Sequence, residues 1–342
     1  MTVEGAGRKP RVTIPPKPKA DAPPPEAPAS GDAPKGWSAG GGGQPARADG
    51  FEAAPTGAAA GTRPPVAAGA YDLATVTKDQ IATLMKGTPD EKRLGATLAR
   101  CQKNYAGLIS SGARVVVNAP AGNGGQPVVT LIPPGFNPAL PARVHTHYHG
   151  WNSSIAEPPG HAAGVTKNLT TSMAANPQTI FVQPECGNVP ATSTTPTFHT
   201  NWSNVQNITS TVDDSLAAAG YGKLDVRERV VSAHSGGGLA LGYAMKNTPD
   251  GSGIKADRIE LEDCMYGAPP GISSRDALEA WAKTPNGQQL KSVVYYEGSG
   301  GNDAKPDAAF KKAFAGRYSH ADGYEHNQAC AKTLDKTPPA PQ

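Results

Sequence analysis

The sequence contains no run of 18 apolar residues, and its first residues include no apolar stretch that follows basic ones. The first absence argues against a transmembrane helix, and the second leaves no ordinary secretory signal visible. We therefore expect no membrane span. The compartment stays open, because the cytoplasm and a non-classical, bacterial-type export route are both compatible with the chain.

Aromatic residues and charge of one sign are also scarce. The 342 residues carry a formal net charge of +3, and aromatic residues make up 6% of them. No basic stripe with interleaved aromatic residues occurs, so we expect no nucleic-acid partner. The four cysteines are far apart and form no CxxC pair: Cys101, Cys186, Cys264 and Cys330. Free, buried thiols are the favoured interpretation, with one or two disulfides as the alternative. No motif indicates a cofactor.

Proline and glycine are unevenly distributed along the chain. Residues 1–70 contain 13 Pro and 12 Gly but few large apolar residues. Such a segment cannot bury enough surface to offset its conformational entropy, so we expect a disordered tail whose role as linker, docking or export segment stays open. We expect a helical prelude over 71–112, a main domain over 113–335 and a disordered C-terminus over 336–342.

Two capping boxes open the helices of the predicted prelude. Thr77 and Gln80 precede a short apolar helical pattern, and Thr88 and Glu91 precede a longer one with Pro89 at its first position. In this motif the hydroxyl and the carboxyl or amide side chain each accept a hydrogen bond from a backbone N–H at the helix start. We expect both helices to pack on the main domain.

Strand and helix patterns alternate through the main domain. Two β-branched runs on either side of a glycine turn, 114–118 and 128–132, predict a hairpin. Further strands are expected over 142–149, 179–183, 226–233, 258–263 and 291–297, and helices over 206–219, 275–283, 304–315 and 327–334. This order predicts an α/β protein whose mostly parallel central sheet is flanked by helices and opens with an antiparallel hairpin.

The run Ala233-His-Ser-Gly-Gly lies between a predicted strand and an apolar helical pattern. A strand that turns into a helix within a few residues forces its middle residue, Ser235, into a strained and exposed position. This is the pattern of a nucleophile elbow, although Ala233 stands where the strict motif has glycine. The alternative is a glycine-rich turn in which Ser235 only caps the helix. The nucleophile is the favoured interpretation.

Three alternating histidines close the strand over 142–149 and share one of its faces: His145, His147 and His149. The favoured interpretation is an oxyanion loop, in which the chain turns at His149-Gly150 and exposes backbone N–H groups. A polar end of the sheet and a zinc site are the alternatives, since imidazole suits zinc. A zinc site would need further ligands with recognisable spacing, and only isolated histidines follow.

With these motifs the chain resembles the α/β-hydrolase family over about residues 113–335. The resemblance rests on the hairpin, the His-Gly loop, the Ser235 elbow and the order of the later elements. It implies an α/β-hydrolase catalytic domain with a triad in the chain order Ser, acid, His. It also implies an oxyanion hole formed by the N–H of Gly236 together with that of Gly150 or Trp151.

The acid and the base of the implied triad are each open between candidates. Asp263, at the end of its strand, is favoured as the acid, with Asp303 and Glu297 as alternatives. His326, at the start of the last helical stretch, is favoured as the base, and His320, in the loop before it, is the alternative. The base would take the proton of the nucleophile and return it to the leaving group.

The sequence therefore predicts a serine hydrolase without a metal, which cleaves an ester or amide bond of a small molecule or peptide through an acyl-enzyme on Ser235. The residues expected to contact substrate are His149, His234 and Tyr266. Trp151, Trp202 and Trp281 are further candidates for lining the pocket, with core packing as an equal alternative for each. Two rivals stay open. One is a zinc-dependent hydrolase that uses the three alternating histidines, and the other is a non-catalytic binding protein on a hydrolase scaffold.

Overall fold

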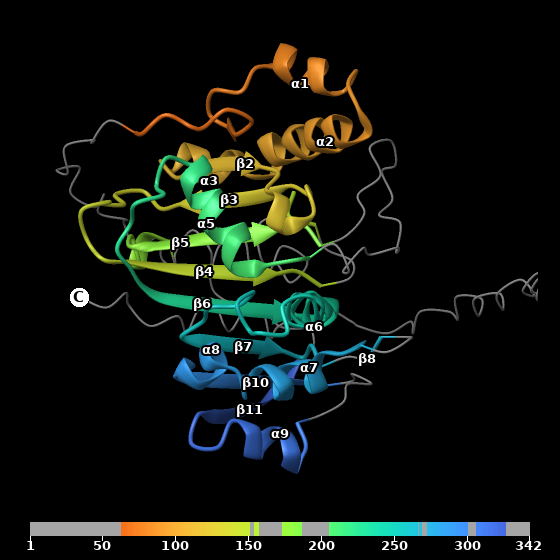
Figure 1. Ribbon diagram of the computed structural model, residues 1–342. Helices are drawn as coiled ribbons and strands as arrows, with labels where there is room; N and C mark the ends of the chain where they lie inside the picture. The colour runs from red at the N-terminus through yellow and green to blue at the C-terminus, as the bar shows by residue number, and fades with distance from the viewer. Residues whose placement is uncertain are drawn as a thin grey trace, which may run out of the picture. The chain divides into compact units, whose positions relative to one another are not determined.

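A mostly parallel β-sheet organises the chain (Figure 1). The structure is a computed structural model that describes residues 63–150, 154–156, 173–186, 205–265, 267–268, 272–299 and 306–325. Within these residues nine strands form one sheet in the order β1-β2-β3-β5-β4-β6-β7-β10-β11. Pairing is antiparallel from β1 through β2 and β3 to β5, and parallel from β5 through β4, β6, β7 and β10 to β11.

The strands of this sheet are β1 (Tyr71–Asp72), β2 (Arg114–Asn118), β3 (Val128–Ile132), β4 (Ala142–Tyr148), β5 (Thr179–Pro184), β6 (Val226–His234), β7 (Arg258–Glu262), β10 (Ser292–Ser299) and β11 (Tyr318–Glu325). A separate two-stranded ribbon pairs β8 (Gly267–Ala268) with β9 (Ile272–Ser273). Because the parallel strands point the same way, their carboxyl ends meet at one edge of the sheet, where open α/β sheets bind ligands.

Helices cover both faces of the sheet, and the sheet separates two hydrophobic cores. One face carries α5 (Ile208–Ala218), α6 (Gly238–Asn247), α7 (Ser274–Trp281) and α9 (Ala308–Ala313), and a short α8 (Pro285–Gln289) leads into β10. The other face carries α1 (Lys78–Leu84), α2 (Pro89–Asn104) and α3 (Ala106–Ser110). Val116 of β2 belongs to the first core, and its neighbours Val115 and Val117 belong to the second. The alternation of side chains along a strand accounts for this division.

Both predicted capping boxes are present at the starts of α1 and α2. The Thr77 hydroxyl accepts from the Gln80 N–H at 3.2 Å, and the Gln80 side chain accepts from the Thr77 N–H at 2.8 Å. The same reciprocal bonds join Thr88 and Glu91, at 3.3 and 2.6 Å. The apolar stripe of α2, including Leu98, faces the second core.

The predicted fold class is confirmed by this topology. The strands expected over 114–118 and 128–132 have the predicted bounds, and the later predicted strands agree to within two residues at each end. The helices expected over 206–219, 275–283 and 304–315 are present as α5, α7 and a shorter α9. The helix expected over 327–334 lies outside the described residues.

Strand β11 was not predicted, and the expectation that His320 lies in a loop is wrong. His320 lies within β11 and pairs in register with Tyr295 of β10. Asp322 and Gly323 interrupt any apolar alternation, so the local pattern does not indicate a strand. The ladder to β10 at the edge of the sheet forms the strand instead, and such pairing is not recorded in the local sequence.

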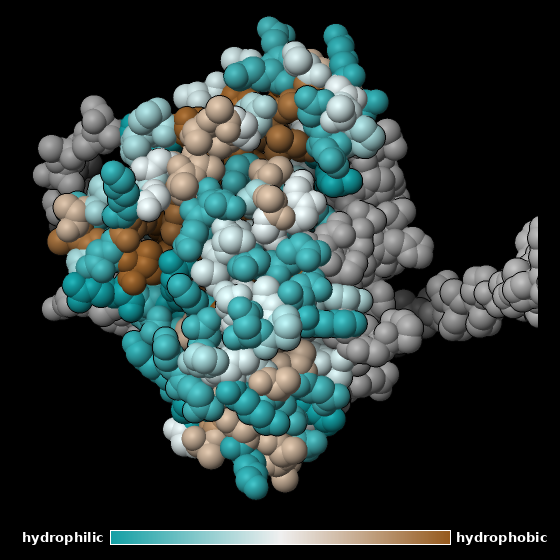
Figure 2. Space-filling model, in the orientation of Figure 1, coloured by the Kyte–Doolittle hydropathy of each residue, from teal (hydrophilic) through white to brown (hydrophobic). Residues whose placement is uncertain are grey.

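The surface over α6, α7 and α9 is mostly hydrophilic in the view of Figure 2, whereas hydrophobic patches lie near α2 and, at the left of the view, by the amino ends of β4 and β5. Within the described residues no helix is both long and apolar enough to cross a membrane. Three of the four cysteines, Cys101, Cys186 and Cys264, are free and buried. The fourth, Cys330, lies outside the described residues.

Candidate active site

Ser235 lies where β6 turns into a helix. β6 ends at His234, a single 3₁₀ turn spans Ser235–Gly237, and α6 begins at Gly238. The φ of Ser235 is 51°, in the left-handed region that a non-glycine residue enters only at an energetic cost. No side chain caps the 3₁₀ turn or α6. Ser235 is therefore not a capping residue, and its strained strand-turn-helix setting is the one expected of a nucleophile elbow.

Two glycines let this turn fit between neighbouring strand ends. A Cβ on Gly237 would lie 2.8 Å from the His149 carbonyl oxygen and closer still to that of Tyr148. A Cβ on Gly238 would collide with the carbonyl oxygen of Cys264, just after β7. Larger residues at either position would push the turn away from the sheet, so these glycines hold Ser235 between the ends of β4 and β7.

Gly150 follows β4 and lies directly against the elbow. A Cβ at this position would be 2.8 Å from Nδ1 of His234 and 3.1 Å from Cβ of Ser235. An oxyanion hole needs backbone N–H groups close to the attacking hydroxyl. The backbone at Gly150 approaches the serine closely enough to serve in that role, and only glycine leaves the space for it.

Asp263 lies immediately after β7, at the same edge of the sheet. Its φ of 47° makes it, with Ser235, one of two non-glycine residues with positive φ among those described. Its residue is 1% exposed, and its N–H donates to the Tyr296 carbonyl at 2.9 Å. A Cβ on Gly298 of β10 would be 2.6 Å from the Asp263 carboxyl carbon. The carboxyl group thus lies over the end of β10.

β11 brings the chain to this edge as well. Its residue Tyr324 pairs with Gly298, the glycine in contact with Asp263, and its last residue, Glu325, pairs with Ser299. His326, the favoured base, follows Glu325 directly in the sequence and lies outside the described residues. The strand ends that precede Gly150, Ser235, Asp263 and His326 therefore meet at one edge.

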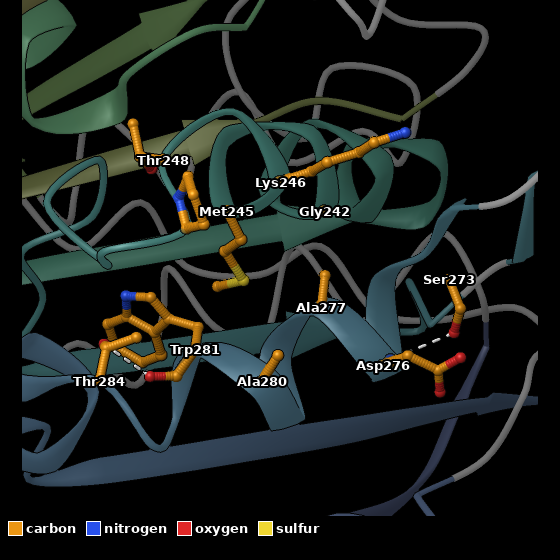
Figure 3. A pocket seen from close by; sticks show the side chains of 11 residues that line it. Gly242, Met245, Lys246, Thr248, Ser273, Asp276, Ala277, Ala280, Trp281 and Thr284 are labelled. Carbon is orange, nitrogen blue, oxygen red and sulfur yellow. Dashed lines mark hydrogen bonds between the residues drawn. The ribbon is translucent and has the colours of Figure 1, made fainter.

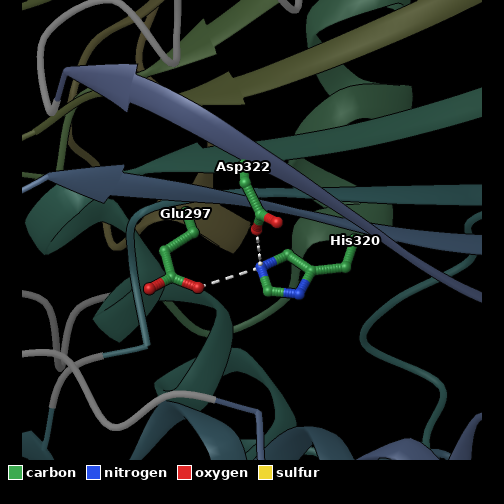
Figure 4. A group of neighbouring side chains, drawn as sticks. All are labelled: Glu297, His320 and Asp322. Carbon is green, nitrogen blue, oxygen red and sulfur yellow. Dashed lines mark ion pairs between the residues drawn. The ribbon is translucent and has the colours of Figure 1, made fainter.

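His320, the alternative base, has two acidic partners (Figure 4). Its Nε2 lies 3.0 Å from Oε2 of Glu297 and 2.9 Å from Oδ1 of Asp322. Its ring also packs against Tyr295, with centroids 5.4 Å apart. Among the described residues, Glu297, His320 and Asp322 form the group of three histidine, cysteine or acidic side chains whose donor atoms lie close enough together to share a metal ion. Glu297, an alternative acid, is thereby placed beside His320.

His145 and His147 converge on a serine inside the sheet. The Ser232 hydroxyl lies 2.9 Å from Nε2 of His145 and 2.8 Å from Nδ1 of His147. Burial, together with the charges of Arg143 and Arg258, lowers the pKa of His145 to about 3. Burial and the neighbouring histidines also hold the pKa of His147 well below its usual value. Both rings are therefore neutral at pH 7.

An acidic residue lies beside this pair on β7. Glu260 is 1% exposed, and its Oε1 lies 2.6 Å from a guanidinium nitrogen of Arg258. Burial raises the pKa of Glu260 to about 7, although the arginine opposes that shift. The interior of β4, β6 and β7 thus holds a buried serine bound to two histidines, and a buried acid on the neighbouring strand that is paired with Arg258.

The third histidine of the strand pattern, His149, turns to a different partner. Its Nε2 lies 2.7 Å from Oε1 of Glu185, and its Nδ1 lies 2.8 Å from the Gly150 carbonyl oxygen. Burial alone would lower the pKa of His149, but Cys186 and Glu185 beside it raise that pKa well above its usual value. His145 and His147 thus reach one hydroxyl from the same strand, whereas His149 lies just after β4 and binds a different residue.

Five predicted site residues lie outside the described residues: Trp151, Trp202, Tyr266, Asp303 and His326. The sequence analysis singled out neither Glu185 nor Ser232. Glu185 could have been found from the sequence, because it is an acidic residue directly after a buried strand, at the carboxyl edge of the sheet. Nothing in the sequence distinguishes Ser232 from other strand residues.

A cavity of about 380 Å³ lies between α6 and α7 (Figure 3). Met245, Lys246, Ala277 and Trp281 are among the residues that line it. Trp281, expected as a candidate for lining the substrate pocket, thus lines this cavity. None of the predicted catalytic residues borders it, so it is distinct from the space around Ser235.

No protein-family model matches the chain, and no curated protein matches it. Similar solved structures include an S-formylglutathione hydrolase from Agrobacterium tumefaciens, at 13% identity and a TM-score of 0.40 over 65% of this chain and 91% of that one. A ferulic acid esterase from Anaeromyces mucronatus is 12% identical, with a TM-score of 0.41 over 65% and 87%. A poly(3-hydroxybutyrate) depolymerase from Bordetella parapertussis is 13% identical, with a TM-score of 0.39 over 69% and 92%. Likenesses this distant do not transfer an activity, so the function is inferred from the geometry of the site.

Proposed function

We propose that the chain is a serine hydrolase in which Ser235 attacks an ester or amide carbonyl and forms an acyl-enzyme. The observation that carries this proposal is the φ of 51° at Ser235, on a turn that close glycine contacts hold against two strand ends. Backbone strain of this kind persists where the surrounding structure enforces it and clusters at active sites. A serine with only a structural role at this turn would not need that conformation.

The backbone around Ser235 supports an oxyanion hole. In the proposed reaction the negative charge develops on the substrate carbonyl oxygen, which receives hydrogen bonds from the Gly236 N–H and from Gly150 or Trp151. Gly236 lies in the uncapped turn before α6, and Gly150 lies against Ser235. These groups are fixed before substrate arrives, so they stabilise the charge without reorganising.

His326 is the proposed base and Asp263 the proposed acid. In acylation, His326 takes the Ser235 proton and gives it to the leaving group. In deacylation, it takes a proton from the water that attacks the acyl carbonyl, and it gives this proton to the Ser235 oxygen as the acyl bond breaks. Asp263 supports this scheme because its carboxyl group lies at the edge where β11 ends. His320 is the weaker candidate, since its Nε2 already binds two carboxylates, one of them Glu297.

The zinc-dependent alternative has no supporting observation at the alternating histidines. Two of them share the hydroxyl of Ser232, and the third binds Glu185. A zinc ion needs several nitrogen, sulfur or oxygen donors directed at one point. We therefore do not favour a metal reaction at this site.

A fluorophosphonate probe tests the proposal, because it reacts covalently with activated serines. We expect the folded protein to be labelled at Ser235 and S235A to be unlabelled. The matched control is S232A, which removes a serine three residues earlier that binds two imidazoles. S232A should keep its labelling and lose stability. Absence of labelling in the folded wild-type protein would support the non-catalytic binding protein instead.

A further inference from the structure

We propose that Glu185 is a positioning residue that holds the oxyanion loop in place through His149. The chain of contacts runs from Glu185 after β5, through the His149 imidazole after β4, to the Gly150 carbonyl beside Ser235. This inference rests on the proposed function of Ser235. Glu185 itself does not touch substrate in this scheme, and His149 acts on the loop rather than on the substrate.

The hydrogen atoms on the His149 ring follow from its partners. A carbonyl oxygen can only accept a hydrogen bond, so Nδ1, 2.8 Å from the Gly150 carbonyl, must carry a hydrogen. Nε2 lies 2.7 Å from a carboxylate oxygen of Glu185, which also accepts. The Cys186 N–H and thiol are each 3.5 Å from Nε2 and are the weaker contacts. His149 is therefore best described as an imidazolium that donates from both nitrogens.

The two charges are almost completely shielded from water. The side chains of His149 and Glu185 are 9% and 1% exposed. Burial by itself would lower the pKa of His149, and the neighbouring Cys186 and Glu185 raise that pKa well above its usual value because they favour the protonated form. A charged pair in such a site is held tightly, since separating it would leave an uncompensated buried charge.

Glu185 is itself fixed from several directions. Its Oε2 accepts from the Ser154 hydroxyl at 3.2 Å and from the Ile155 N–H at 3.4 Å. Its backbone N–H donates to the Pro127 carbonyl at 2.9 Å, and its carbonyl accepts from the Asn123 side chain at 2.9 Å. The carboxylate therefore has a rigid position relative to the sheet. It joins the His149-Gly150 turn to residues 154–156.

The Gly150 carbonyl matters because its bond to His149 restrains the turn at His149-Gly150. With that oxygen held 2.8 Å from Nδ1 of His149, the Gly150 backbone cannot rotate freely. A Cβ at Gly150 would lie only 3.1 Å from Cβ of Ser235, so a rotation of this backbone would move groups next to the nucleophile. Displacement of a catalytic group by about 1 Å can cost about 10²-fold in rate.

This assignment differs from the expectation that His149 contacts substrate. Both of its ring nitrogens have partners within the protein, at 2.7 and 2.8 Å. No ring N–H is left to donate to a bound molecule. In this geometry His149 instead orients the backbone of Gly150, which lies against Ser235.

Two substitutions of His149 each break one of its two bonds. The amide nitrogen of an asparagine can occupy the place of Nδ1, whereas that of a glutamine can occupy the place of Nε2. H149N should keep the donor to Gly150 and lose the bond to Glu185, and H149Q should keep the bond to Glu185 and lose the donor. Because the positioning needs both bonds, we expect kcat to fall about 10- to 100-fold in each variant.

A second pair tests Glu185. E185L removes every acceptor at similar size and should lower kcat about 10- to 100-fold with KM within about twofold. E185Q should recover most of that loss, because its amide can still hold Nε2 of a neutral His149. The control is D72N, which breaks a buried pair with Arg114 at 2.7 Å between β1 and β2. D72N should lower Tm and leave kcat unchanged.

The readouts are kcat and KM for a chromogenic ester, the rate of fluorophosphonate labelling, and Tm. If kcat of the His149 and Glu185 variants follows Tm as it does in D72N, or if E185Q is as impaired as E185L, the positioning role is overturned while the proposed function stands. If wild-type protein is neither labelled nor active, the proposed function fails and this inference fails with it. Labelling of the wild-type protein, a loss of kcat in E185L and its recovery in E185Q would support the proposed function and the positioning role together.

Discussion

The interior and the carboxyl edge of β4, β6 and β7 carry the same types of side chain in different settings. Ser232 precedes Ser235 by three residues, and Glu260 precedes Asp263 by three. In the interior, Ser232 is completely buried within β6 and binds two imidazoles. At the edge, Ser235 and Asp263 have positive φ and lie just beyond their strands.

Under the proposed function, a hydrogen bond between serine and histidine does not identify the nucleophile. Ser232 has such a bond at 2.8 Å with His147, yet it lies in regular strand and has no helix N-terminus behind it. Ser235 has the strained turn, the glycine contacts and the uncapped helix start. The backbone around a serine is therefore more informative than its nearest side chain. Four predictions test this difference, from the largest expected effect to the smallest.

The two histidine candidates should differ most. H326A should lower kcat by about 10⁵-fold, because the nucleophile would lose its base. H320A should change kcat by no more than about threefold, because it removes only the partly exposed ion pairs with Glu297 and Asp322. Steady-state kinetics on one chromogenic ester measures both. A large loss in H320A with little loss in H326A would reverse the assignment of the base.

The two acids form the second contrast. D263N should lower kcat by about 10⁴-fold, since an amide favours the wrong tautomer of the base. Glu260 lies within β7, three residues before Asp263. E260Q should leave kcat within about twofold of wild type, because Glu260 binds Arg258. The same kinetic assay measures both variants. Equal losses would mean that edge and interior are not functionally distinct.

Gly150 is expected to show an intermediate effect. G150A introduces a Cβ within 3.1 Å of Ser235 and 2.8 Å of His234, and should lower kcat by about 10²-fold. The control is G107A in α3, where an added Cβ meets nothing within 4 Å. G107A should raise stability by about 0.5–1 kcal/mol and leave kcat unchanged. Similar kcat values in G150A and G107A would contradict the close approach of Gly150 to Ser235.

The smallest effect concerns stability at low pH. His145 and His147 have pKa values below that of an unfolded histidine, so below about pH 6.5 the unfolded chain binds protons that the folded chain does not. Each ring should therefore lower the free energy of unfolding by about 1.4 kcal/mol for each pH unit of acidification. This loss should not occur above about pH 6.5, where both states are neutral.

Urea unfolding at about pH 7.5 and about pH 5 measures this dependence. H145N should show a smaller difference between the two conditions than wild type, because one buried histidine no longer titrates in the unfolded state. An unchanged difference in H145N would mean that the interior histidine is protonated in the folded protein.

Local sequence patterns predicted the parts of the fold that local physics controls. The capping boxes at Thr77 and Thr88 satisfy backbone groups within three residues, and the β-branched runs alternate between two cores. The Ser235 turn was predicted for the same reason, because its small neighbours are adjacent in sequence. In these places the information lies within a few residues of the structure that it determines.

Contacts between distant segments were not predicted. β11 depends on its ladder to β10 rather than on its own pattern. The alternation of His145, His147 and His149 predicted their common face but not that the first two bind Ser232 and the third binds Glu185. Partners 36 to 87 positions apart are brought together by the order of strands in the sheet, which no short pattern records.

The bonds that α2 makes to residues 154–156 bear on how the chain could be shortened. The Tyr105 hydroxyl donates to the Ile155 carbonyl at 2.8 Å, and the Asn104 side chain donates to the Ala156 carbonyl at 2.7 Å. Ser154 and the Ile155 N–H in turn bind the Glu185 carboxylate. A fragment that begins at residue 113 would lose this brace, whereas one that begins at residue 63 would keep it. A fragment for expression and engineering should therefore include α2 and Tyr105, which follows it.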